Sequence, residues 1–145
     1  MNNNFDFRYI LSYLGSLPYI IILLDKTFFG QIQNNIINDF YIYYSLIIIF
    51  FIGAINWSLK DDISNFLAVY GTLPSILGII IIILQIFSFS YLISTFFLII
   101  FILFQLIVDY FFIYDLNNNK KIFFKLRLPL SMFICFCLTT NLTEF

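Results

Sequence analysis

Long apolar runs separated by short polar segments follow one another along this chain. Five runs stand out, over residues 9–24, 40–59, 73–87, 91–114 and 126–142. About 17 helical residues suffice to cross the apolar layer of a bilayer, and the first run approaches this length with its flanks. Backbone groups in hydrocarbon must pair within their own segment, so helices are expected even where Ile and Phe abound. The pattern predicts an all-α polytopic membrane protein, a bundle of five transmembrane helices forming a single domain over residues 1–145.

Polar and turn-forming residues mark the connections between these runs. Residues 27–39, rich in Asn and Gln, read as a polar loop, and residues 117–119 are three consecutive Asn. Ser88 and Ser90 punctuate the third and fourth runs, which predicts a tight helical hairpin there.

The basic residues give the orientation of the five spans. One side of the membrane would carry six of them, and the other side would carry Lys26 alone. The six are Arg8, Lys60, Lys120, Lys121, Lys125 and Arg127. Because basic loops stay on the cytoplasmic or matrix side, we expect the N-terminus inside and the C-terminus outside.

Proline positions predict one irregular helix. Pro74 and Pro129 open their apolar runs, where a missing N–H costs little, so we expect each in a first helical turn. Pro18 lies in the middle of the first run, shortly after Gly15. We therefore expect the first helix to be kinked or locally unwound around Leu14 to Leu23.

Composition supports a membrane class and excludes several functions. The chain is 62% hydrophobic and only 10% charged, against roughly 25% charged in soluble domains. Its mean hydropathy is +1.00, and a small soluble core cannot hide that much apolar surface. The formal net charge of −1 leaves no broad basic face for nucleic acid. The expected partners are the lipid bilayer and other membrane protein subunits.

The absence of histidine narrows the chemistry further. It removes haem, zinc and iron sites that use imidazole, together with the usual general base. Cys135 and Cys137 are two residues apart, so they do not face each other on a helix and read as buried free thiols. No nucleophile lies near a base, and we expect neither a cofactor nor an enzyme.

Four short motifs, in order along the chain, carry a family resemblance. They are Leu14-Gly15-Ser16-Leu17-Pro18-Tyr19, Phe51-Ile52-Gly53-Ala54-Ile55-Asn56-Trp57-Ser58-Leu59, Leu73-Pro74-Ser75 and Lys125-Leu126-Arg127-Leu128-Pro129-Leu130-Ser131. Together they resemble the transmembrane protein 69 family over nearly the whole chain. The resemblance implies a small multi-span protein of the bacterial inner (plasma) membrane or the mitochondrial inner membrane. Members usually carry His-Trp-Gly where this chain has Asn56-Trp57-Ser58, so an imidazole role at that place is not carried over.

Asp109 is the residue that most needs an explanation. It lies inside the end of the fourth run, where a carboxylate is expensive and normally faces protein or water. Gln105 is four residues earlier and shares its helix face. The functional reading is a proton or ion relay. The structural reading, which we favour, is a pair with Arg127 on the next helix, through a bidentate contact.

Other polar residues near the same membrane surface have two readings each. Asn56 could bind a ligand or hold Arg127. Alternatively, Asn56 could join two helices through a hydrogen bond, with Trp57 as an interfacial anchor. Gly53 and Ala54 before them permit close helix approach. Three lysines could contact anionic lipid head groups or simply fix topology. They are Lys120, Lys121 and Lys125.

Three functions remain open on these observations. The first is a structural or assembly-type membrane component that packs against partners. The second is a small transporter-like protein with a polar site at Asp109 and Asn56. The third is an accessory subunit of a respiratory-chain complex, because the Phe, Ile, Tyr, Asn and Lys bias reflects A/T-rich codons such as those of an organelle.

Overall fold

The computed structural model describes residues 7–55, 65–87, 90–114 and 120–142, and helices make up nearly all of these residues. No strand occurs within these ranges. The chain divides into two units, one made of residues 1–37 and 99–145 and the other of residues 38–98. The all-α class is therefore confirmed, whereas the single-domain organisation stays a prediction.

The first apolar run is a broken helix. It forms α1 (Phe7–Leu14), α2 (Leu17–Leu24) and the π-helical segment η1 (Asp25–Phe29). At the break, the Ser16 backbone N–H and hydroxyl both donate to the Tyr13 carbonyl, at 3.0 and 2.7 Å. Pro18 is the second residue of α2, where its missing N–H is tolerated. The expected irregularity around Pro18 is confirmed.

A tight turn follows η1 and shortens the expected polar loop. Gly30 adopts left-handed angles (φ 59°, ψ 29°), and its N–H donates to the Asp25 carbonyl at 2.6 Å. The buried Asp25 carboxylate accepts the backbone N–H groups of Gln31 and Ile32 at 3.4 and 3.0 Å. The prediction of a loop over residues 27–39 is wrong, because α3 (Asn34–Ile55) already begins at Asn34. Its polar first turn suits a helix start, where N–H groups lack intrahelical partners.

Close helix contacts hold the unit of residues 38–98 together. It contains most of α3, all of α4 (Asn65–Ile86) and the first two turns of α5 (Tyr91–Val108). A methyl group placed on Gly53 of α3 would lie 2.6 Å from Pro74 Cγ and 3.0 Å from the Gly71 carbonyl oxygen. One placed on Gly78 of α4 would overlap the Phe50 ring of α3. The predicted close approach at Gly53 is therefore present.

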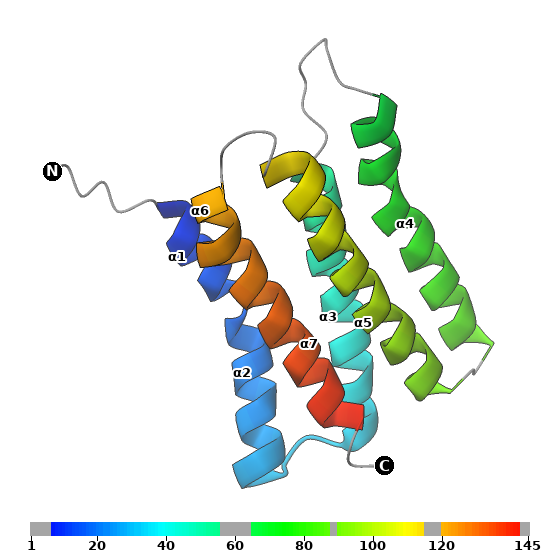
Figure 1. The fold of residues 1–145 in the computed structure, drawn as a ribbon. Helices are drawn as coiled ribbons and strands as arrows, with labels where there is room; N and C mark the ends of the chain where they lie inside the picture. The colour runs from blue at the N-terminus through cyan, green and yellow to red at the C-terminus, as the bar shows by residue number, and fades with distance from the viewer. Residues whose placement is uncertain (1–6, 56–64, 88–89, 115–119, 143–145) are drawn as a thin grey trace, which may run out of the picture. The chain divides into compact units, whose positions relative to one another are not determined.

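The position of Pro74 corrects the sequence prediction. Pro74 lies inside α4, because the helix begins at Asn65 rather than near Leu73. Apolar surroundings favour continuing the helix, and one lost backbone bond at a proline is tolerated there. The short connection between α4 and α5 agrees with the expected hairpin, although residues 88 and 89 lie outside the described ranges (Figure 1). The Gln85 side-chain amide donates to Ser94 Oγ at 2.8 Å across it.

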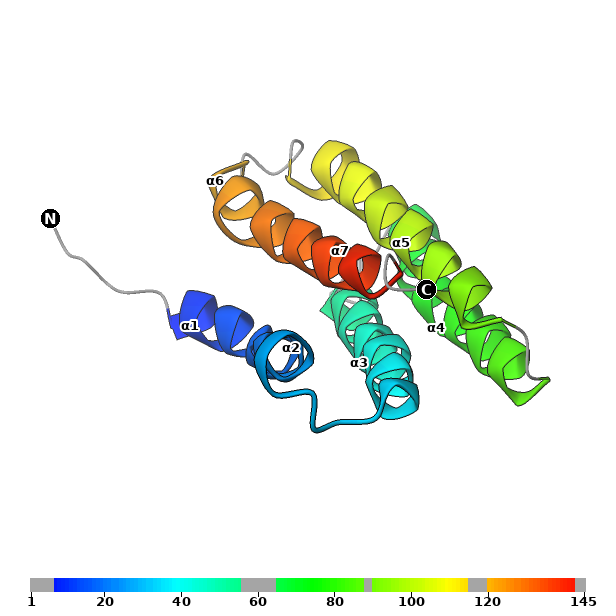
Figure 2. The same ribbon diagram turned by 90° about the horizontal axis from the view of Figure 1, so that it is seen from below.

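The C-terminal part of the chain contains two further π-helical segments. After α5 comes η2 (Asp109–Tyr114), and then α6 (Lys120–Ile122), η3 (Phe123–Arg127) and α7 (Leu128–Leu142) follow. Pro129 is the second residue of α7, but the helical segment already begins at Lys120, so Pro129 does not open it. Figures 1 and 2 show α2 beside α7.

Buried residues recur at a regular spacing from Arg127, the last residue of η3, along α7. They are Arg127, Ser131, Ile134, Leu138 and Asn141. Steps of four and three residues keep these side chains on one helix face. Cys135 and Cys137 are also buried and are free thiols, as expected.

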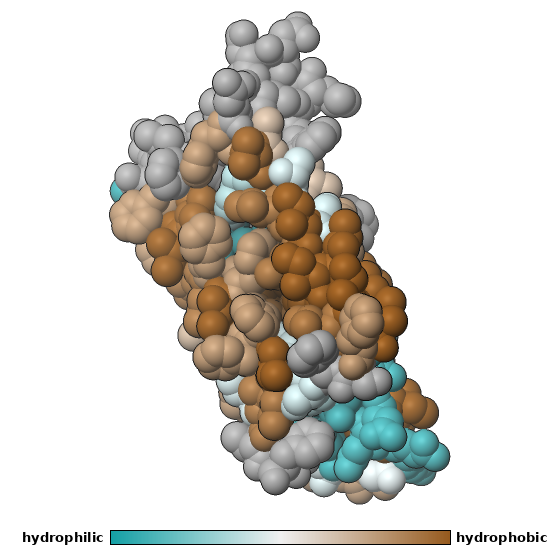
Figure 3. Space-filling view, turned by 90° about the vertical axis from the view of Figure 1, so that its right-hand side faces the viewer, coloured by the Kyte–Doolittle hydropathy of each residue, from teal (hydrophilic) through white to brown (hydrophobic). Residues whose placement is uncertain are grey.

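Within the part of the chain that the structure describes, four helical segments are long and apolar enough to cross a membrane. They are Asn34–Ala54, Ala68–Ile86, Tyr91–Phe111 and Lys120–Leu142. Only 28% to 39% of each apolar window is buried within the protein, so much apolar surface faces outward. Figure 3 shows one such surface, mostly brown among the described residues. These helices indicate a multi-pass membrane protein. The first predicted span is helical but divided, and it is not among the four.

Candidate functional site at a buried ion pair

Asp109 and Arg127 form a buried ion pair. Arg127 Nε donates to Asp109 Oδ2 at 2.6 Å. The two side chains are 3% and 8% exposed, respectively. The predicted pairing is confirmed. The guanidinium supplies a fixed positive charge that compensates a carboxylate removed from water.

Each partner sits at the edge of a π-helical segment. Asp109 is the first residue of η2 and Arg127 is the last residue of η3. In η3, the N–H of Leu128 reaches back five residues to the Phe123 carbonyl. The wider turn rotates the residues after it relative to an α-helix, and such segments often occur at functional sites.

Aromatic contacts hold η2 against the segment that carries Arg127. The Tyr110 ring packs against Phe123 with centroids 5.1 Å apart and against Phe124 at 6.1 Å. Tyr110 directly follows Asp109, so these contacts fix the backbone beside the carboxylate. Aromatic pairs at such distances contribute about 0.5–1.5 kcal/mol beyond area burial.

Tyr13 supports the site from α1 in a way that sequence reasoning missed. Its hydroxyl donates to the Lys125 carbonyl oxygen at 2.5 Å. In a regular helix that carbonyl would accept the N–H of the residue four positions later, which is Pro129 and has none. Carbonyls freed by proline in apolar surroundings commonly find such a substitute donor. The signal in the sequence is Pro129, because a proline leaves the carbonyl four residues earlier without its usual N–H donor.

Two further polar side chains lie on the same helix faces. Gln105 is one turn before Asp109 and is 1% exposed, and Ser131 is one turn after Arg127 and is 2% exposed. The predicted placement of Gln105 on the face of Asp109 agrees with this burial. The ion pair is thus flanked by buried polar groups on both helices.

The bidentate contact that we expected is not formed. Arg127 Nη2 is buried and has no hydrogen-bond partner among the described residues, so the guanidinium engages Asp109 through Nε rather than as a fork. A buried N–H without a partner costs about 1–3 kcal/mol or more when the group is charged. The site is therefore compensated in charge but not fully satisfied in hydrogen bonding.

The remaining predicted residues divide into two groups. Asn56 and Trp57 lie outside the described residues. Lys120, Lys121 and Lys125 are exposed on α6 and η3, close in sequence to Arg127. Their contact with lipid head groups stays a prediction. In the described part of the chain, no group of three or more His, Cys, Asp or Glu residues could hold a metal ion.

Comparisons with known proteins identify no relative: no family model, no curated protein and no solved structure matches the chain. The resemblance to the transmembrane protein 69 family stays a hypothesis that rests on the four motifs.

Proposed function

We propose that this chain is a small integral membrane protein that acts as a structural or assembly component. In this proposal its spans pack against partner membrane proteins of a bacterial inner membrane or a mitochondrial inner membrane. The observation that carries it is the state of the two carboxylates that are buried among the described residues. Asp109 is engaged by Arg127, and Asp25 accepts backbone N–H groups of its own turn. Both have structural roles.

The outward apolar surface supports partners as well as lipid. Helices that face only lipid need no specific surface, whereas helix–helix association in membranes uses close packing at small residues. Within residues 38–98 the contacts of Gly53 and Gly78 show this kind of packing between α3 and α4. Further association would use the exposed faces of the same helices.

Native electrophoresis of membranes solubilised in mild detergent tests this proposal. We expect the chain, of 17.2 kDa, to migrate in a complex larger than its detergent-bound monomer. Membranes lacking the chain should accumulate less of that complex, and re-expression should restore it. Migration as a monomer, with all neighbouring complexes unchanged, would contradict an assembly role. A stable stoichiometric place in a respiratory-chain complex would select the accessory-subunit alternative.

A transporter-like function is the second candidate, and Arg127 favours it. A buried guanidinium N–H without an acceptor among the described residues is a place where an anion or water could bind during transport. Flux measurements in proteoliposomes test this idea. Ion- or proton-driven uptake that Asp109→Asn abolishes would replace the structural proposal with this one.

A further inference from the structure

Lys121 and Lys125 form an exposed basic pair on the helical segment that carries Arg127. Lys121 belongs to α6 and Lys125 to η3, and both side chains are exposed. Residues four apart are neighbours on a helix surface, so the two ammonium groups lie on one side of this segment. Neither ammonium group has a hydrogen bond or an ion pair with the residues that the structure describes. Lys120 is also exposed but has an interaction of its own, so we do not count it with the pair.

An exposed aromatic ring lies beside the two lysines. Phe124 is 54% exposed, although its ring also contacts the rings of Phe123 and Tyr110, with centroids 5.4 and 6.1 Å apart. In the expected orientation, this segment enters the apolar layer from the inner membrane surface. Lysines next to an exposed Phe are typical of segments at the boundary between head groups and acyl chains.

The backbone beneath the basic pair is fixed by other elements. The Tyr13 hydroxyl of α1 donates to the carbonyl oxygen of Lys125 itself, at 2.5 Å. Figure 1 shows α1 and α6 at the same end of the chain's helices. The Tyr110 ring of η2 packs against Phe123, with centroids 5.1 Å apart. A backbone that is already ordered loses less conformational freedom when a ligand binds.

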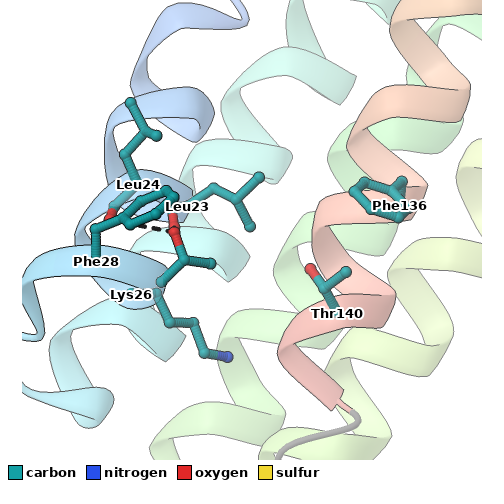
Figure 4. Close-up of a pocket in the computed structure, with 7 residues that line it drawn as sticks. Leu23, Leu24, Lys26, Phe28, Phe136 and Thr140 are labelled. Carbon is teal, nitrogen blue, oxygen red and sulfur yellow. Dashed lines mark hydrogen bonds between the residues drawn. The ribbon is translucent and has the colours of Figure 1, made fainter.

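The pocket between η1 and α7 offers no comparable cation. This pocket has a volume of about 460 Å³ and mainly apolar walls, including Leu23 and Phe136. Figure 4 shows its lysine, Lys26, extending from η1 toward α7. Lys26 Nζ donates to Asn141 Oδ1 at 2.7 Å, and Lys26 has a further interaction within the chain. An anionic ligand therefore finds unengaged ammonium groups at Lys121 and Lys125 rather than in this pocket.

We propose that Lys121 and Lys125 bind the phosphate of an anionic phospholipid in the inner leaflet, with the Phe124 ring against its acyl chains. Lysines at the inner end of a membrane helix attract anionic head groups. The exposed ring beside them favours an amphiphile over a free anion, because it adds apolar contact area for the acyl chains. The assignment rests on the proposed membrane location, and the surrounding bilayer supplies the ligand.

Native mass spectrometry of the full chain in mild detergent tests this site. Phosphatidylglycerol and phosphatidylcholine with identical acyl chains are titrated separately. We expect tighter binding of phosphatidylglycerol, and a loss of about fivefold in that affinity for each of Lys121→Gln and Lys125→Gln. Phe124→Ala should weaken the binding of both lipids to a similar degree, because their acyl chains are the same. No preference between the lipids would overturn the proposal, and an unchanged affinity in Phe124→Ala would contradict the acyl-chain contact.

Two matched controls separate a site from a general effect of charge. Lys121→Arg with Lys125→Arg keeps both positive charges and should retain the affinity for phosphatidylglycerol. Lys60→Gln removes the same charge from another lysine that the sequence assigns to the inner side, and it should leave the affinity nearly unchanged. Equal losses in Lys60→Gln and Lys121→Gln would overturn the site. So would inorganic phosphate that binds with the same lysine dependence while the phospholipid shows none.

Photo-crosslinking of the unaltered chain provides a readout that needs no variant. A phosphatidylglycerol with a diazirine close to its head group should label residues 120–127 preferentially. Labelling spread evenly over the exposed helix faces would contradict a defined site. Carbonate extraction separates this proposal from the proposed function. A chain that resists extraction but shows no lipid preference refutes only the lipid site, whereas a chain that is extracted refutes the membrane location.

Discussion

At the scale of single residues, the sequence was most informative where a polar side chain is costly. A carboxylate inside an apolar run demands a partner, and the next helix offers Arg127, so the contact with Asp109 could be predicted. The geometry of this contact could not be predicted, because hydropathy does not reveal the π-helical segments that orient both side chains. The bond from Tyr13 to the Lys125 carbonyl was also missed, since it depends on which helix faces the proline.

The ion pair should behave as a coupled unit. Asp109→Asn and Arg127→Gln each leave an uncompensated buried group, and breaking such a pair typically costs about 3–5 kcal/mol. We expect each variant to lower the unfolding temperature in detergent and the amount accumulated in the membrane. The double variant should recover part of the loss. Asp39→Asn, at an exposed carboxylate, is the control, and strictly additive losses at the pair would show that the two groups are not coupled.

The Tyr13 hydroxyl should matter only because Pro129 cannot donate. Tyr13→Phe removes one hydrogen bond, worth about 0.5–1.5 kcal/mol, and denaturant unfolding should show that loss. Tyr43→Phe, at an exposed tyrosine, should have no effect. When Pro129→Ala restores a backbone N–H, the effect of Tyr13→Phe should shrink. An undiminished effect in that background would disprove the substitution of one donor for the other.

At the scale of elements, the apolar runs predicted the helices better than their ends. The fourth run matches α5 and η2 over residues 91–114, since Asp115 and the following Asn residues mark its end clearly. The predicted starts of α3, α4 and α6 lie several residues after the observed ones. Polar residues predict loops, but these helices extend beyond their apolar runs. Pro74 was misplaced for the same reason, whereas the break near Pro18 was predicted from the glycine and proline together.

The contact between α3 and α4 should be sensitive to added volume. Gly53→Val places new atoms against Pro74 and the Gly71 carbonyl, where backbone and a rigid ring cannot move aside. Overpacking of this kind typically costs about 1–3 kcal/mol, which should appear as a lower unfolding temperature. Ala54→Val adds similar volume at the neighbouring exposed position and should be tolerated. Equal tolerance at both positions would contradict the close approach of the helices.

At the scale of the whole molecule, composition determined the class and little else. A chain that is 62% hydrophobic with 10% charged residues predicts membrane helices, and four segments of its described part have the required length and apolar character. The first run is different. Its helices α1 and α2 are eight residues each, and neither spans a bilayer alone. We propose that residues 7–29 cross the membrane as one broken helix, because five spans then place six basic residues on one side and Lys26 alone on the other, the stronger asymmetry.

Accessibility labelling of the two termini tests this central claim most directly. In a background with Cys135→Ala and Cys137→Ala, a single cysteine is introduced by Asn4→Cys or by Thr143→Cys. Intact and permeabilised membrane preparations are then treated with a membrane-impermeant maleimide. Five spans predict that the two positions react from opposite sides, with Asn4→Cys protected until the inner face is opened. Labelling of both positions from the same side would contradict the account, leaving four spans with residues 7–29 outside the bilayer core.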